Sequence, residues 1–382
     1  MTDMIQAVLD ETVATGAAPF VIAMIGNRDG ITWSGAAGNC APGKPAELDT
    51  LFGLYSMTKA VCATAATILI DRRQLDLDTP AADILPEIAA LQVLEGFDGD
   101  TPRLRAPNSP ITIRQLATHT SGLVYELFSP DLQRCLELTG TPSYFSWKRA
   151  GLNHPLLFDP GKGWGYGIGL DWLGLIIEQI DGRRIDAFCQ DEIFTPLGMN
   201  DTCFEIDEAR LQRLACVFTR TGDNSFAHQD GRDRQTGAIQ SGNEAEKDYY
   251  GMGGCLYGTV PDYLRLLRLH LRGGELDGVR LISESLMRRL QQNIVGDITV
   301  DFDWFPGPRK GHAFAYMRVE EDTPGMRSAG SCFWAGGANS HYWIDFENDL
   351  VAIFATYDAP FLDPPFMARF AEFERAVYAQ PA

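Results

Sequence analysis

Ser56 and Lys59 are the residues of this chain whose types and spacing could do chemistry. They stand three positions apart in Phe52-Gly-Leu-Tyr-Ser56-Met-Thr-Lys59, directly before the uncharged stretch Ala60 to Ile70. We expect a buried helix there, and helical spacing puts hydroxyl and amine on one face, where the amine can take the proton of a serine nucleophile. The unpaired N–H groups and positive dipole end of a first helical turn favour a developing anion and an uncharged lysine. By themselves, the two residues would more often be a helix cap and a solvated lysine.

Several segments further along the chain, most of them rich in glycine, strengthen the catalytic interpretation. They are His119-Thr-Ser-Gly-Leu123, Pro160-Gly-Lys-Gly-Trp-Gly-Tyr166-Gly-Ile168-Gly-Leu-Asp171-Trp172, Pro196-Leu-Gly-Met-Asn-Asp-Thr202, Gly251-Met-Gly-Gly254 and Phe333-Trp334-Ala335-Gly336-Gly337. Together with the Ser56 segment, and in this order and at these separations, they make the sequence resemble the serine β-lactamase-like superfamily of class C β-lactamases and penicillin-binding proteins. Within it the chain is most similar to family VIII carboxylesterases and lovastatin-type acyltransferases, from about residue 5 to residue 357.

The resemblance implies roles for three side chains and two backbone groups. Ser56 would be the acylated nucleophile, Lys59 its base, and Tyr166 the hydroxyl that passes a proton between Ser56 and the leaving oxygen. Without the resemblance, Tyr166 would be a packing tyrosine near a turn. The backbone N–H groups of Ser56 and Gly337 would form the oxyanion hole, where each donor typically contributes about 3 to 4 kcal/mol in the transition state. Lys59 must then be a free amine near neutral pH, which burial favours and a nearby unpaired acid opposes.

Two departures from the β-lactamase pattern predict the substrate class. Trp334-Ala335-Gly336 replaces the lactamase Lys-Thr-Gly, which removes a cation and a hydroxyl that would hold a substrate carboxylate. Ile168 replaces the Asn of Tyr-x-Asn, so the amide that binds a lactam side chain is absent. We therefore expect a serine carboxylesterase for short-chain, neutral esters, and place Trp334, Gly336, Ile168 and Tyr250 in the substrate cleft. Trp334 and Tyr250 could equally be core residues.

Three other functions stay open from the sequence. An acyltransferase would use the same acyl-enzyme but pass the acyl group to an alcohol or amine. Residual β-lactamase or D-amino-acid amidase activity ranks lower. A non-catalytic binding protein of this fold ranks last, because all three catalytic side chains are present.

Composition and charge narrow the class of protein. The chain has 382 residues, 45% hydrophobic and 22% charged, as in globular proteins, and its length favours two lobes. The 51 acidic and 32 basic residues give a net charge of −19, which disfavours a nucleic-acid partner. The longest apolar run, Ala60 to Ile70, is far shorter than the ~20 residues of a membrane span. Acidic residues near the N-terminus disfavour a secretory signal, so we expect a cytoplasmic protein.

Cofactors and partners follow from the same residues. Eight cysteines and six histidines are scattered without metal-ligand spacing, so we expect free thiols and neither a metal nor an organic cofactor. His119 is expected to be a structural turn residue. His341 follows Gly337 closely enough to reach the cleft, but a surface histidine is expected. The expected partner is a small-molecule ester, bound by a monomer or homodimer.

The pattern of apolar residues places these motifs on elements. Helical spacing covers residues 4–15, 171–180, 261–271, 283–292 and 365–378, and strand patterns cover 20–25, 30–33, 342–345 and 350–356. Asp171 and Trp172 are expected to pack the helix after Tyr166, and residues 222–243 to form a long loop. Strands at both ends predict an α/β (α+β) fold with one antiparallel sheet flanked by helices. We expect an α/β domain from 1–75 and 230–382, an inserted helical domain from 76–229, and the active site in the cleft between them.

Overall fold

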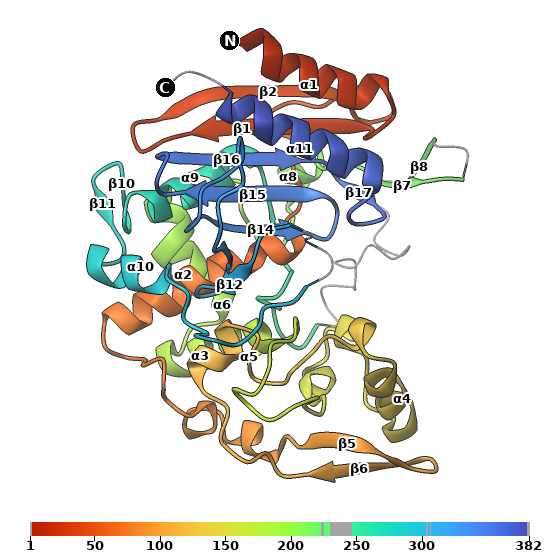
Figure 1. Ribbon diagram of the computed structural model, residues 1–382, viewed down its shortest axis with the longest axis vertical. Helices are drawn as coiled ribbons and strands as arrows, with labels where there is room; N and C mark the ends of the chain where they lie inside the picture. The colour runs from red at the N-terminus through yellow and green to blue at the C-terminus, as the bar shows by residue number, and fades with distance from the viewer. Residues whose placement is uncertain (1, 223–224, 230–246, 303–304, 306, 380–382) are drawn as a thin grey trace.

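One eight-stranded antiparallel sheet joins the two ends of the chain (Figure 1). The computed structural model describes residues 2–222, 225–229, 247–302, 305 and 307–379. N-terminal β1 pairs with C-terminal β16, with Ile22 opposite Ala355 and Gly26 opposite Val351. The predicted sheet built from both termini is therefore confirmed. Its strands, in spatial order, are β12 (Lys310–His312), β13 (Met317–Val319), β14 (Cys332–Gly336), β15 (Ser340–Asp345), β16 (Leu350–Ala355), β1 (Phe20–Gly26), β2 (Ile31–Ala41) and β3 (Lys44–Pro45).

Helices cover both faces of this sheet. On β15, His341 and Trp343 pack against Phe370 of α11 (Pro364–Tyr378), whereas the intervening Tyr342 packs against Tyr263 of α9 (Val260–Leu271). Successive strand residues point to opposite faces, so α11 and α9 lie on opposite sides. Helix α1 (Thr2–Ala14) packs beside α11 and over β2. Burial from both sides explains why all seven residues of β1 are buried.

The nucleophile segment begins a helix buried inside the molecule. Helix α2 (Thr58–Asp71) packs against α5 (Gly169–Asp181), and twelve of its residues are buried. Its sequence is uncharged from Ala60 to Ile70 because almost every face meets protein. The other helices are α3 (Ile113–Ala117), α4 (Pro130–Thr139), α6 (Ile185–Cys189), α7 (Thr195–Leu197), α8 (Glu208–Leu211) and α10 (Glu284–Leu290).

The middle of the chain lies below the sheet in Figure 1, where α3, α4 and α5 accompany a hairpin of β5 (Val93–Asp98) and β6 (Thr101–Arg105). Further short strands pair outside the main sheet. Strand β4 (Phe52–Gly53) pairs with β9 (Tyr257–Gly258), and β10 (Glu275–Leu276) with β11 (Val279–Arg280).

None of the described helices is long and apolar enough to cross a lipid bilayer.

One predicted loop is partly a strand. Residues 226–229 were expected inside a long loop, but Phe226–Gln229 is strand β8, which pairs with β7 (Val217–Arg220) beside β17 (Asp358–Ala359). Phe226 packs edge-on against Phe218, and this contact compensates for weak sequence patterning. The rest of the predicted loop, 223–224 and 230–243, lies outside the described residues. The domain boundaries near residues 75 and 229 remain a proposal.

Candidate active site

Ser56 lies in a single 3₁₀ turn, Tyr55–Met57, directly before α2. Tyr55 has a positive φ of 46°, a strained conformation for a residue with a side chain, which the surrounding structure must hold. Two contacts do so: the Leu54 N–H donates to the Leu256 carbonyl at 2.8 Å, and the Tyr263 hydroxyl donates to the Met57 carbonyl at 2.8 Å. The backbone around Ser56 is therefore fixed from both sides.

Lys59 is completely buried, and its amine points to Ser56. The Lys59 Nζ donates to Ser56 Oγ at 3.1 Å, to the Tyr125 hydroxyl at 3.0 Å and to the Gly253 carbonyl at 2.6 Å. Among the described residues no carboxylate forms an ion pair with this amine. The amine is shielded from water and its three acceptors carry no charge, so Lys59 Nζ is placed to exchange a proton with Ser56 Oγ.

Tyr166 is the second partner of the serine hydroxyl. Its hydroxyl lies 2.5 Å from Ser56 Oγ, and the Lys59 Nζ lies 4.8 Å from the centre of its ring. The three predicted catalytic side chains therefore meet, although 110 positions separate Ser56 from Tyr166.

A short backbone ladder holds Tyr166 in place. The Gly165 N–H donates to the His119 carbonyl, the Gly167 N–H to His119 Nδ1, and the Tyr125 N–H to the Tyr166 carbonyl. His119 is buried with a φ of 58°, and burial lowers its pKa well below the usual value, so it is a neutral acceptor. His119 thus has the structural role expected from the sequence.

The expected oxyanion-hole residues border one cavity with Ser56. Strand β14 approaches the Ser56 segment so closely that a Cβ at Gly336 would lie 2.6 Å from the Leu54 carbonyl oxygen. Only glycine permits this approach, which brings Gly337 to the cavity wall beside Ser56. The N–H groups of Ser56 and Gly337 as oxyanion donors remain a proposal.

The cavity at Ser56 is small and aromatic. It has a volume of about 160 Å³, and its described walls carry no charged side chain. Such a space accepts a short, neutral acyl group better than a charged one. The walls are Tyr55, Ser56, Tyr125, Leu127, Phe128, Tyr144, Phe145, Trp147, Tyr166, Gly253, Gly254, Gly337 and Phe361.

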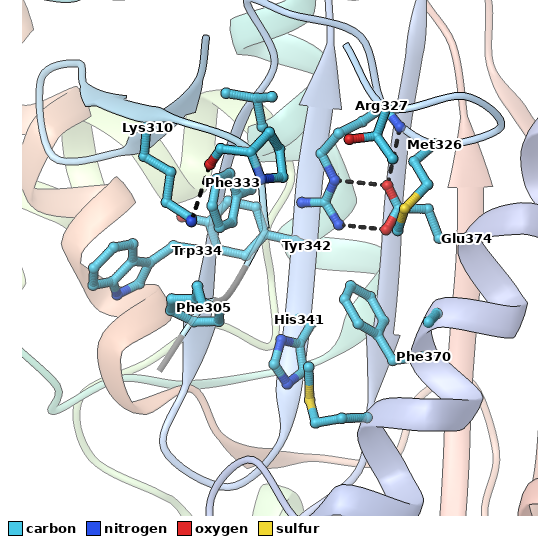
Figure 2. Close-up of a pocket in the computed structure, with 15 residues that line it drawn as sticks. Phe305, Lys310, Met326, Arg327, Phe333, Trp334, His341, Tyr342, Phe370 and Glu374 are labelled. Carbon is cyan, nitrogen blue, oxygen red and sulfur yellow. Dashed lines mark hydrogen bonds and ion pairs between the residues drawn. The ribbon is translucent and has the colours of Figure 1, made fainter. Parts of the chain in front are cut away.

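Trp334 borders a different cavity. Its ring lies 5.0 Å from that of Tyr166, so it supports the tyrosine. A second apolar cavity of about 300 Å³ lies between strands β12 to β15 and α11, with Trp334, Phe333, His341 and Phe370 in its walls (Figure 2). There the Arg327 guanidinium donates to Glu374 at 2.7 and 2.8 Å, which pairs both buried charges. A contact between Trp334 and substrate stays a proposal.

Three other residues lie away from the Ser56 cavity walls. Ile168 is buried and caps the start of α5, where its carbonyl accepts the Asp171 N–H at 3.1 Å. Tyr250 packs on Phe204 at 5.0 Å and under the Arg184 guanidinium. His341 was expected at the surface, but it is buried and stacks on Phe370 at 4.6 Å, so that expectation was wrong. Burial lowers the pKa of His341 to about 3.

Tyr125 and the Gly253 carbonyl were not predicted from the sequence to belong to the site. Both accept from Lys59, and Tyr125 is buried with its pKa raised well above the usual value, mainly by burial. Tyr125 follows His119-Thr-Ser-Gly-Leu123 by two residues, so the motif pointed to its neighbourhood without identifying the hydroxyl.

Comparisons with known proteins agree with this geometry. The Beta-lactamase family profile matches residues 5–375. Monacolin J acid methylbutanoyltransferase of Aspergillus terreus is 30% identical over 88% of this chain and 84% of its own. Lovastatin esterase of Penicillium rubens is 28% identical over 81% of this chain and 80% of its own. A mutant simvastatin synthase from Aspergillus terreus superposes with a TM-score of 0.88 at 25% identity, over 99% of this chain and 96% of the other.

Proposed function

The chain belongs to the Beta-lactamase family and is a serine acyl-transfer enzyme, and we propose that it is a carboxylesterase that hydrolyses short-chain esters through an acyl-enzyme on Ser56. The observation that carries the proposal is the contact of Ser56 Oγ with both Lys59 Nζ and the Tyr166 hydroxyl. A serine hydroxyl needs such a base before it can attack an ester carbonyl.

The proposed reaction uses each of these groups in turn. Ser56 Oγ attacks the ester carbonyl carbon and transfers its proton to Lys59. The N–H groups of Ser56 and Gly337 stabilise the negative charge on the carbonyl oxygen. Tyr166 delivers a proton to the leaving alkoxide as the carbon–oxygen bond breaks. Lys59 then returns its proton to Tyr166, which resets both groups. Water attacks the acyl-enzyme and gives a proton to Lys59, Tyr166 protonates Ser56 Oγ as the carboxylic acid leaves, and Lys59 again restores the Tyr166 proton.

Acyl-chain length should control the rate. A cavity of about 160 Å³ cannot enclose a long hydrocarbon chain, so its outer carbons stay in water and add no transition-state binding. We expect kcat/KM for p-nitrophenyl butyrate to exceed that for p-nitrophenyl decanoate by at least about tenfold. Steady-state kinetics with a series of p-nitrophenyl esters measures this. Phe145→Ala, which opens one cavity wall, should narrow the ratio, and equal rates in the wild type would contradict the acyl-pocket assignment.

An acyltransferase is the second candidate. The names of two relatives favour it: a methylbutanoyltransferase at 30% identity and simvastatin synthase among the solved structures. Both activities share the acyl-enzyme and differ in which nucleophile reaches it. Reaction of p-nitrophenyl butyrate with a competing alcohol, followed by chromatography of the products, separates them. Mostly free acid supports the esterase, and mostly transferred ester supports the acyltransferase.

Tyr125→Phe should lower kcat about tenfold without unfolding the protein. The change removes one of three acceptors around the Lys59 amine, and a hydrogen bond of this kind contributes about 0.5 to 1.5 kcal/mol net. Ester kinetics and a thermal melt measure the two effects. Tyr249→Phe is the matched control, because Tyr249 is buried and its hydroxyl has no partner among the described residues. Equal kcat values for the two variants would exclude a role for Tyr125.

A further inference from the structure

A carboxyl group is buried behind the proposed base. Asp171, on α5, has no exposed surface, and its Oδ1 accepts the Gly253 N–H at 2.9 Å and the Tyr144 hydroxyl at 3.3 Å. Its Oδ2 is buried without a hydrogen-bond partner among the described residues. Burial raises the pKa of Asp171 to about 6, and the nearby Lys59 opposes this rise. From the sequence, Asp171 was expected only to pack its helix. The structure shows in addition that its carboxylate holds the Gly253 N–H.

Gly253 connects this carboxyl group to Lys59. Its N–H donates to Asp171, and its own carbonyl accepts the Lys59 amine at 2.6 Å. A Cβ at position 253 would lie 2.5 Å from Asp171 Oδ2, 2.8 Å from the Tyr144 hydroxyl and 2.9 Å from the Tyr125 hydroxyl. Any side chain there would push these oxygens away. Glycine is therefore needed at this position of the Gly251-Met-Gly-Gly254 segment.

This arrangement bears on the proposed function, on which the inference rests. We propose that Asp171 is a positioning residue for Lys59. It acts through the Gly253 backbone, which fixes the amine against Ser56, and through its charge, which governs how readily the amine is free to accept a proton.

Several ionisable side chains from neighbouring elements face Asp171. Lys59 and Cys62 approach from α2, Tyr125 and Tyr144 from the loops after α3 and α4, and the pair Tyr249 and Cys255 from the segment before β9. Burial raises the pKa of each of these tyrosines and cysteines, so they stay neutral near pH 7. Lys59 is the basic side chain in this group.

The charge of Asp171 opposes loss of a proton from Lys59. Above about pH 6, Asp171 is ionised, and its negative charge stabilises the ammonium form of Lys59. The free amine is then scarcer at a given pH than it would be beside a neutral side chain. Below that pH, Asp171 is protonated and this effect disappears. Asp171 therefore shifts the acid limb of the kcat/KM profile, where the base loses its function, to higher pH.

Asp171→Asn tests this directly. The amide oxygen can still accept the Gly253 N–H, but the side chain cannot ionise. We expect the acid limb of the kcat/KM profile for p-nitrophenyl butyrate to move to lower pH by about half a unit to one unit. The pH dependence of Ser56 labelling by a fluorophosphonate should move by the same amount. Asp171→Ala, which also removes the anchor of Gly253, should lower kcat at least about tenfold while KM changes little.

Glu178→Gln is the matched control. Glu178 lies on the same helix, accepts the Ile185 N–H at 2.8 Å, and has a pKa raised by burial, but it does not contact Gly253. The acid limb of the kcat/KM profile of Glu178→Gln should coincide with that of the wild type. An unmoved limb in Asp171→Asn, or equal shifts in both variants, overturns the proposal for Asp171 while leaving Ser56 as nucleophile. Full activity in Ser56→Ala overturns the proposed function itself, and with it the role of Asp171.

Discussion

Ser56→Ala should abolish ester hydrolysis and leave the fold intact. The hydroxyl is the only atom group lost, and alanine is compatible with the 3₁₀ turn that holds position 56. Removal of the nucleophile from a serine enzyme typically costs about 10⁴-fold or more in kcat, because its partners cannot act alone. Hydrolysis of p-nitrophenyl acetate under saturating conditions measures the loss, and circular dichroism and a thermal melt check folding.

A covalent probe and a second serine make this result specific. A fluorophosphonate should add one phosphonyl group to the wild type and none to Ser56→Ala, as read by intact-protein mass spectrometry and peptide mapping. Ser331→Ala is the control, because it also removes a serine hydroxyl, and the buried Ser331 hydroxyl has no partner among the described residues. Ester turnover in Ser56→Ala within tenfold of the wild type would rule out the acyl-enzyme on this residue.

The spacing of apolar residues along the sequence predicted several of the helices and strands, because each of them buries one side in the protein. Apolar spacing located α5, α9 and α11 because each buries one side against the protein, and alternation located β15 and β16. Between the strand patterns at 20–25 and 30–33, the chain reverses at Asn27, whose side chain accepts the backbone N–H groups of Asp29 and Gly30.

Contacts between distant segments could not be derived in the same way. Helical spacing alone brings Lys59 to Ser56, but its other acceptors are 66 and 194 positions away in the sequence. The carbonyl of Gly253 carries no side-chain signal, and one tyrosine among twelve does not stand out by type. The burial of His341 likewise depends on α11 folding back over β15. The resemblance supplied Tyr166, and the structure supplied the groups that hold Lys59.

Lys59→Met and Tyr166→Phe should both impair the reaction severely, by different amounts. Methionine fills the space of the buried lysine without an amine, so Ser56 loses its base, and the rate should fall by about 10³- to 10⁴-fold. Phenylalanine keeps the ring among His119 and Trp334 but removes the hydroxyl at 2.5 Å from Ser56 Oγ, and about 10²- to 10³-fold is expected. Both changes should affect acylation, which pre-steady-state kinetics follows as the burst of p-nitrophenol.

The pH profile distinguishes the base from the relay. If Lys59 accepts the Ser56 proton, the residual activity of Lys59→Met should lose the acid limb of kcat/KM, because no group remains that must be unprotonated. Tyr166→Phe should keep that limb at a lower rate. Lys310→Met is the control, since Lys310 borders the second cavity and donates to the Pro308 carbonyl at 3.1 Å, away from Ser56. The opposite result would be an acid limb that Lys59→Met keeps and Tyr166→Phe loses. Tyr166, as a phenolate, would then be the base that takes the Ser56 proton, and Lys59 would not be.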